Sequence, residues 1–261
     1  MATLPIGIPT RSLRLPLRKA MRLAAELGAD GVEIDVRNEL RIADFSQTAL
    51  RQFRKLLEDL RLGVLAVSFP TRRGFDDPDD LERRVLATRE AMSFAYKIGA
   101  QVVIGQAGAI SESEEDGSAN DALVDSLGLL AAHGERVGAR FAFASGAAPT
   151  AQARVLDRLP EGAIGVSIHP GLLIAEGHDT EHAAAQLGSR ALHLCATDAS
   201  RDPSSSARAS EVVLGRGEAD LPAVLARLEE RDFRGPVTVE RTEGNDPSGD
   251  LANAVAYLRS L

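Results

Sequence analysis

Three residues that can move a proton or bind a metal ion, His169, Cys195 and Glu240, each stand at or near the end of a short apolar segment. An imidazole, a thiol and a carboxylate form a nitrogen, sulfur and oxygen donor set, and such a set suits catalytic Zn²⁺ with one coordination position open to water. In a metal-free site, Glu240 is instead our candidate general base and His169 our candidate second acid or base. A third interpretation is that Cys195 is an ordinary buried thiol and His169 a hydrogen-bonded histidine in a site without chemistry.

The apolar segments recur eight times, and each is followed by an amphipathic helix. The segments are Leu4–Ile8, Gly31–Ile34, Val64–Val67, Gln101–Ile104, Arg140–Phe143, Ile164–Ile168, Ala191–Leu194 and Pro236–Glu240. Strands separated by helices pair in parallel, and eight of them can close without an exposed edge. We therefore predict a single (β/α)8 TIM barrel over residues 1–261, a typical length for that fold. The alternative, an open doubly wound sheet, lacks its Gly-rich turn after the first strand.

The alternation of side chains along a strand predicts which residues share a face. The bulky residues, Leu192 and Leu194 among them, fall on the parity that faces the helices. The opposite parity, facing the barrel interior, holds Ala142, Ala144, Ser167, His169, His193, Cys195, Thr238 and Glu240. Because the carboxyl ends of barrel strands form the catalytic mouth, we expect Ala144, His169, Cys195 and Glu240 to meet there.

Further candidates for ligand binding lie on the same strands and on the loops after them. Glu33 shares the inward parity of its segment and could bind hydroxyl groups, with a salt bridge as the alternative. His193 and Asp198 are expected to position a substrate. The loop arginines that could seat a phosphate in bidentate fashion are Arg72, Arg73, Arg201 and Arg216, although ordinary solvated arginines give the same pattern.

The composition excludes several classes of partner. The formal net charge of -8 and the absence of Trp disfavour nucleic acid, which needs clustered basic side chains and stacking surfaces. No window has the ~20 apolar residues of a membrane helix, and the first residues lack the charged and apolar parts of a signal peptide. Together with the single cysteine, this predicts a cytoplasmic protein. Assembly into a homo-oligomer is left open.

The order and spacing of several segments resemble the sugar phosphate isomerase/epimerase family, also called the xylose isomerase-like TIM barrels. The segments that carry the resemblance are Leu27–Glu33, Ser68–Gly74, His169–Asp179, and Leu214–Gly217 through Phe233–Gly235 to Glu240. Members of that family typically hold a divalent ion with a glutamate after strand five, an aspartate after strand six, a histidine after strand seven and a glutamate after strand eight. The resemblance places Ala144, His169, Cys195 and Glu240 at those positions, so three of the four ligands differ.

These differences predict a degenerate metal site. Mg²⁺ and Mn²⁺ favour oxygen ligands, so we expect neither ion to bind. Ordinary epimerisation by a pair of carboxylates is not expected either, because Ala144 and Glu240 supply only one carboxylate. The resemblance implies a small carbohydrate, polyol or keto-sugar as partner, phosphorylated or not, with no cofactor except Zn²⁺ on His169, Cys195 and Glu240. The alternatives are a non-catalytic sugar-binding or scaffold protein and a Zn²⁺-dependent hydrolase or lyase. DNA repair, known from one branch of these barrels, is disfavoured by the acidic charge.

Overall fold

All eight expected segments form parallel strands that close into a barrel. The computed structural model describes residues 4–113, 118, 120–201 and 209–261. In chain order, the barrel strands are β1 (Ile6–Pro9), β2 (Gly31–Asp35), β3 (Gly63–Ser68), β4 (Val102–Gln106), β5 (Arg140–Ala144), β6 (Ile164–Ile168), β7 (Ala191–Ala196) and β10 (Val237–Val239). Pairing of β10 with β1 closes the barrel. The predicted TIM barrel is therefore confirmed, and the open doubly wound sheet is excluded.

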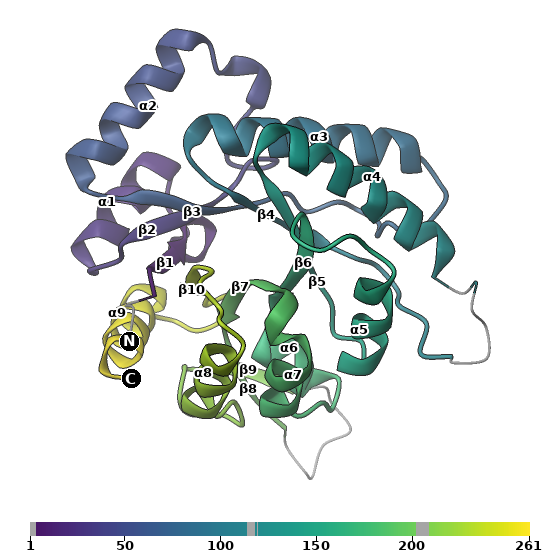
Figure 1. Ribbon diagram of the computed structural model, residues 1–261. Helices are drawn as coiled ribbons and strands as arrows, with labels where there is room; N and C mark the ends of the chain where they lie inside the picture. Colours follow the sequence, from purple (N-terminus) through teal and green to yellow (C-terminus); the bar gives the residue numbers. More distant parts are fainter. Residues whose placement is uncertain (1–3, 114–117, 119, 202–208) are drawn as a thin grey trace.

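Helices surround the barrel, and the last helix of the chain lies beside its first strand (Figure 1). The α-helices are α1 (Leu17–Glu26), α2 (Gln47–Leu60), α3 (Leu81–Ile98), α4 (Asp121–Val137), α5 (Pro149–Asp157), α6 (Pro170–Ala175), α7 (Thr180–Leu187), α8 (Leu221–Glu230) and α9 (Pro247–Ser260), with short 3₁₀ helices at Thr10–Leu13, Ile42–Asp44 and Gly188–Arg190. Local chemistry sets several of their ends. Asp179 caps α7 by accepting the backbone N–H of His182 at 2.6 Å. Gly138 ends α4 in the left-handed conformation that glycine adopts without strain.

Two groups of buried apolar side chains fill the two sides of the strands. Outward-facing residues such as Phe141 and Phe143 are fully buried and belong to the larger cluster, which includes residues of the helices. A second cluster lies inside the barrel and consists of Ala66, Val102, Ile104, Ala142 and Leu192. This second cluster fills the barrel below the mouth, and the polar residues of the candidate site lie near the carboxyl ends of the strands.

The place of Leu192 in the interior cluster corrects its predicted outward orientation. Ala191 pairs with Val166 of β6, but the next paired residue of β7 is His193, so Leu192 is an extra residue in a bulge. Opposite it lies Gly165, where an added Cβ would come within 2.7 Å of the Leu192 Cγ. The bulge therefore brings both Leu192 and His193 into the barrel interior.

A short antiparallel hairpin that the sequence analysis did not identify follows β7. Its strands are β8 (Asp198–Ser200) and β9 (Ser210–Val212), and Ser200 pairs with Ser210. The hairpin adds a small sheet beside the carboxyl end of the barrel. Within the described residues, no helix is long and apolar enough to cross a membrane.

Candidate functional site

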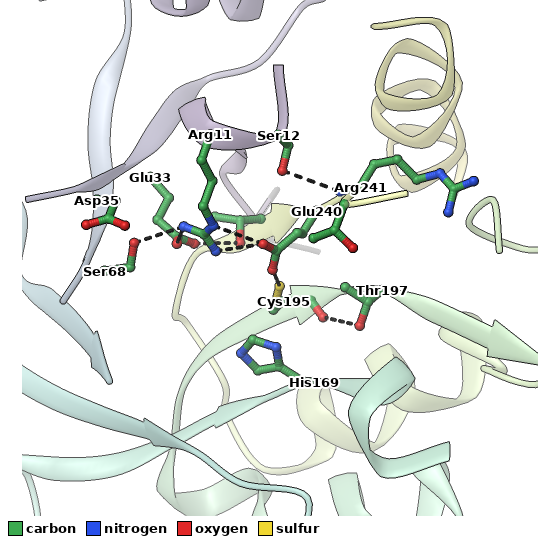
Figure 2. Close-up of polar contacts among 12 residues, drawn as sticks. Arg11, Ser12, Glu33, Asp35, Ser68, His169, Cys195, Thr197, Glu240 and Arg241 are labelled. Carbon is green, nitrogen blue, oxygen red and sulfur yellow. Dashed lines mark hydrogen bonds and ion pairs between the residues drawn. The ribbon is translucent and has the colours of Figure 1, made fainter. Parts of the chain in front are cut away.

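His169, Cys195 and Glu240 converge at the carboxyl end of the barrel, as predicted. His169 directly follows β6, Cys195 lies in β7 and Glu240 directly follows β10. One candidate ligand atom from each lies within 4.8 Å of the others, and the Cys195 thiol donates to Glu240 Oε2 at 3.3 Å. Figure 2 shows the three side chains close together in the mouth. The fourth expected position, Ala144, ends β5 and contributes only a methyl group.

Arg11 is the main residue of the site that the sequence analysis missed. It lies in the 3₁₀ turn directly after β1 and extends its guanidinium across the mouth (Figure 2). Its Nε and Nη2 donate to Glu240 Oε1 at 3.0 and 2.8 Å. Its Nη1 pairs with Glu33 and donates to Ser68 Oγ at 2.9 Å. One cation therefore joins two carboxylates of the mouth. Glu33 forms a salt bridge, and its predicted binding of hydroxyl groups stays a prediction.

The signal that could have identified Arg11 is its position next to the first strand. A residue directly after a barrel strand lies at the mouth, whatever its type. Its partners, Glu33 and Glu240, are 22 and 229 residues away in the sequence, so no local pattern connects them to Arg11. Only closure of the barrel brings these three residues together.

Burial and charge together determine the protonation states in the mouth. Burial acts to raise the pKa of Glu33, but the charge and hydrogen bond of Arg11, together with the neighbouring histidines, outweigh it and lower that pKa to about 2. For Cys195, burial and the neighbouring carboxylate of Glu240 both raise the pKa of the thiol. Glu33 is therefore ionised at neutral pH, whereas Cys195 keeps its proton and is not a nucleophilic thiolate.

A continuous hydrogen-bonded chain runs below the mouth from His169 to Glu33. Ser167 Oγ lies 3.0 Å from His169 Nε2 and 2.7 Å from His193 Nδ1. Thr238 Oγ1 lies 3.0 Å from His193 Nε2 and donates to Glu33 Oε2 at 3.2 Å. Burial lowers the pKa of His193 to about 3, so its ring is neutral. His193 was predicted to position a substrate, but it is fully buried and contacts these hydroxyl groups instead.

Asp198 was also predicted to position a substrate, and its contacts give it a different role. Its Oδ1 accepts the backbone N–H groups of Ala199 and Ala219, both at 2.9 Å. Its Oδ2 accepts those of Gly215 at 3.0 Å and Gly217 at 2.8 Å. The side chain is buried, and both oxygens are occupied by the backbone. Asp198 therefore holds the loop before α8 in place.

The loop arginines of the sequence analysis lie on the surface. Arg73 pairs with Asp79 at 2.5 Å, and Arg201 pairs with Glu218 at 2.8 Å, each pair being largely exposed to solvent. Arg216 is exposed as well. Exposed ion pairs contribute only ~0–1 kcal/mol, so these side chains can exchange partners at little cost. Their role in binding a phosphate stays a prediction.

The donor set of the mouth fits zinc in its types of atom, but its carboxylate is already engaged. Glu240 Oε1 accepts two N–H groups of Arg11, and Glu240 Oε2 accepts the Cys195 thiol. A zinc ion would need the Cys195 proton to leave and at least one Glu240 oxygen to become free. The imidazole and the thiol are poor ligands for Mg²⁺ and Mn²⁺, which agrees with the expectation that neither ion binds. That expectation stays a prediction.

A separate hollow of about 770 Å³ lies at the opposite end of the barrel. It is lined mainly by apolar residues at the starts of β1 and β10 and on α8 and α9, among them Ile6, Leu225 and Val237. None of the candidate site residues lines it. The hollow is therefore separate from the candidate site, whose residues lie at the mouth.

Comparison with known proteins identifies a family and several similar folds. The sequence profile described as xylose isomerase-like TIM barrel matches residues 21–261. No curated protein matches the chain. A xylose isomerase-like TIM barrel protein from Mycobacterium smegmatis, solved in complex with magnesium, is 19% identical with a TM-score of 0.79, covering 99% of this chain and 96% of that one.

Two further solved structures show the range of chemistry found on this fold. The apo form of 3-keto-D-glucoside 4-epimerase from E. coli is 14% identical with a TM-score of 0.75, covering 99% of this chain and 100% of that one. The IOLI protein with a bound zinc atom is 16% identical with a TM-score of 0.78, covering 98% of each chain. At these identities the likeness shows the fold alone, and the roles of residues in the site must come from this chain.

Proposed function

Because the chain belongs to the xylose isomerase-like TIM barrel family, we propose that its mouth binds a small carbohydrate, polyol or keto-sugar without Mg²⁺ or Mn²⁺. The observation that carries the proposal is the ion pairing of Arg11 with Glu33 and Glu240. Arg11 places a fixed positive charge where the family resemblance implies a divalent ion. The epimerase of a keto-glucoside among the similar folds supports a carbohydrate ligand.

Arg11 has a hydrogen-bond donor left for this ligand. A guanidinium carries five N–H groups. Those of Nε and Nη1 and one of Nη2 are used by Glu240, Glu33 and Ser68. The second N–H of Nη2 has no acceptor among the residues that the structure describes, and 33% of the side chain is exposed. A carbonyl or hydroxyl oxygen of a sugar fits this donor.

The same arrangement suits proton transfer next to a carbonyl group. With the carbonyl oxygen on Arg11, Glu240 as general base takes the proton from the adjacent carbon, and the electron pair of the broken C–H bond moves into an enediolate. Arg11 stabilises the negative charge that forms on the oxygen. His169, the second acid or base, exchanges the hydroxyl proton. Return of the carbon-bound proton to the other carbon or face completes an isomerisation or epimerisation.

The test separates binding from turnover. Chelator-treated protein is screened by thermal shift against neutral monosaccharides, polyols and keto-sugars and against their phosphates, because a bound ligand raises the melting temperature. Each ligand found is then incubated in D₂O with the protein, and NMR follows the entry of deuterium next to the carbonyl. Glu240→Gln tests whether deuterium entry depends on the barrel mouth. Glu181→Gln, a partly exposed carboxylate of α7 paired with Arg227, is the matched control.

Each result has a defined meaning. Stabilisation by a sugar, with deuterium entry that is lost in Glu240→Gln and kept in Glu181→Gln, supports a metal-independent enzyme. Stabilisation without deuterium entry supports the non-catalytic sugar-binding protein. Absence of stabilisation by every compound of the panel contradicts the proposal. Tighter binding of the phosphorylated forms would support the predicted role of Arg73, Arg201 and Arg216.

A second candidate function follows from the approach of His169, Cys195 and Glu240 within 4.8 Å. These atoms are a suitable donor set for Zn²⁺, which would supply an activated water to a hydrolase or lyase. Elemental analysis of protein purified without chelator separates the two candidates. About one zinc per chain would favour the second function, while the first expects much less than one.

A further inference from the structure

Glu33 sets the direction of the buried hydrogen-bonded chain. An ionised carboxylate accepts hydrogen bonds and never donates them, so the hydroxyl hydrogen of Thr238 points to Glu33 Oε2 at 3.2 Å. The Thr238 oxygen then has only acceptor capacity left for His193 Nε2, 3.0 Å away. A neutral imidazole carries one ring hydrogen, so that of His193 is on Nε2. The charge of Arg11, which lowers the pKa of Glu33, keeps this end of the chain ionised.

The same direction continues to His169. His193 Nδ1 carries no hydrogen and accepts the hydroxyl of Ser167 at 2.7 Å. Because Ser167 has then used its only hydrogen, its oxygen accepts from His169 Nε2 at 3.0 Å. Each donor fixes the next one, and only one arrangement of hydrogens satisfies every contact from Glu33 to His169.

We propose that this chain fixes His169 as its Nε2–H tautomer and presents an unprotonated Nδ1 to the barrel mouth. His169 is then the group that touches the ligand, and Ser167, His193, Thr238 and Glu33 are positioning residues that act through it. The role of Nδ1 toward a ligand rests on the proposed function, but the tautomer is a property of the protein without ligand. Figure 2 shows the His169 ring beside Cys195 and Glu240, where a ligand would meet it.

The fixed tautomer gives the mouth a defined polarity. His169 Nδ1 and Glu240 are acceptors, while Arg11 offers a donor and the Cys195 hydrogen is already used by Glu240. A neutral ligand with a hydroxyl group next to a carbonyl matches this pattern, because its hydroxyl donates to Nδ1 and its carbonyl accepts from Arg11. A phosphate offers mainly acceptor oxygens, and these would be repelled by the lone pair of His169 Nδ1. In a phosphorylated ligand, the phosphate therefore lies away from His169.

The experiment observes the ring nitrogens directly. Protein labelled with ¹⁵N-histidine is studied without ligand at pH 7 by long-range ¹H–¹⁵N NMR, and signals are assigned with His169→Gln and His193→Gln. We expect His169 and His193 to be protonated on Nε2 and unprotonated on Nδ1. Ser167→Ala and Thr238→Val break the chain and should shift His169 toward a mixture of tautomers, whereas Thr238→Ser should restore the single tautomer. The exposed His182 is the internal control and should not change.

The outcomes distinguish this inference from the proposed function. A native His169 protonated on Nδ1, or a His169 tautomer unchanged in both folded chain-breaking variants, would overturn the inference. Circular dichroism checks the fold, and if Ser167→Ala does not fold, the comparison of Thr238→Val with Thr238→Ser still decides. A fixed tautomer in a protein that binds no sugar contradicts only the proposed function. Sugar binding with a mixed tautomer in the native protein contradicts only the inference.

Discussion

Arg11 and its two carboxylates show how one residue changes the chemistry of the whole mouth. A bound divalent ion can be removed by a chelator or replaced by another ion. The guanidinium of Arg11 is a permanent part of the chain, so its positive charge stays in the mouth. It also keeps Glu33 ionised, and Glu33 in turn orders the hydrogens of Thr238 and His193. The position of a single cation thus controls both the charge and the proton arrangement of the site.

Replacement of Arg11 by methionine tests this dependence. The free energy of unfolding should fall by about 3 kcal/mol, because loss of one partner of a buried ion pair leaves its carboxylates without compensation. Solvent at the exposed third of Arg11 keeps the loss near the lower end of the usual range. Urea unfolding at pH 7 measures it. Arg73→Met, which removes an exposed pair with Asp79, should cost less than ~1 kcal/mol, and equal losses in the two variants would contradict the assignment.

The pH dependence of stability should reveal His193. Its folded pKa of about 3 lies below the ordinary value of 6.5, so the unfolded chain binds a proton that the folded chain does not bind between these values. The free energy of unfolding should therefore fall as pH decreases below 6.5, by up to ~1.4 kcal/mol per pH unit for this group. Glu33, with its lowered pKa, adds a loss that begins only below about pH 4.5.

Urea unfolding between pH 7 and pH 5 isolates the histidine contribution. His193→Gln should make the curve shallower in this range, and the slope that remains comes from His169 and His133, whose pKa values burial also lowers. The exposed His182→Gln is the control and should keep the native slope. A slope that is the same in the native protein and in His193→Gln would show that His193 does not cause the acid destabilisation.

At the scale of elements, the sequence predicted what depends on local patterns and missed what depends on pairing. All eight strands were found because their apolar runs and the helices between them are local features. The bulge at Leu192 was missed, since strict alternation cannot show that two neighbouring residues face the same side. The β8 and β9 hairpin was missed because its strands are three residues each and lack an apolar pattern.

Asp198 joins that hairpin to the loop before α8, and Asp198→Asn tests its role. An amide has one acceptor oxygen and an NH₂ group that would face backbone N–H donors, so part of the set of four hydrogen bonds is lost. We expect the free energy of unfolding to fall by about 3 kcal/mol and hydrogen exchange to accelerate at Gly215 and Gly217. The control is Asp220→Asn, which preserves the cap of α8 and should change little. Unchanged exchange in Asp198→Asn would contradict the structural role.

At the scale of the whole molecule, the two ends of the chain close the barrel together. The backbone N–H of Val237 in β10 donates to Pro5 O at 3.0 Å, just before β1. Asp30 connects three parts of the fold, because its carboxylate accepts the N–H of Ile6 at 2.9 Å and pairs with Arg259 of α9 at 2.9 Å. The same closure brings Arg11 to Glu240. The site is therefore a product of complete barrel formation, which explains why its key ion pair could not be predicted from sequence.

Asp30→Ala should weaken this closure selectively. The variant removes the acceptor of the Ile6 N–H and the partner of Arg259, and we expect a loss of about 1–2 kcal/mol in the free energy of unfolding. Hydrogen exchange should accelerate at Ile6 and Val237, on the two sides of the seam, and remain slow in β5, which lies on the opposite side of the barrel. Asp59→Ala removes an exposed pair with Lys55 and should change neither measurement. Uniform acceleration in all strands would contradict this expectation. It would show that Asp30 supports global stability and that β1 and β10 do not separate independently of the rest of the barrel.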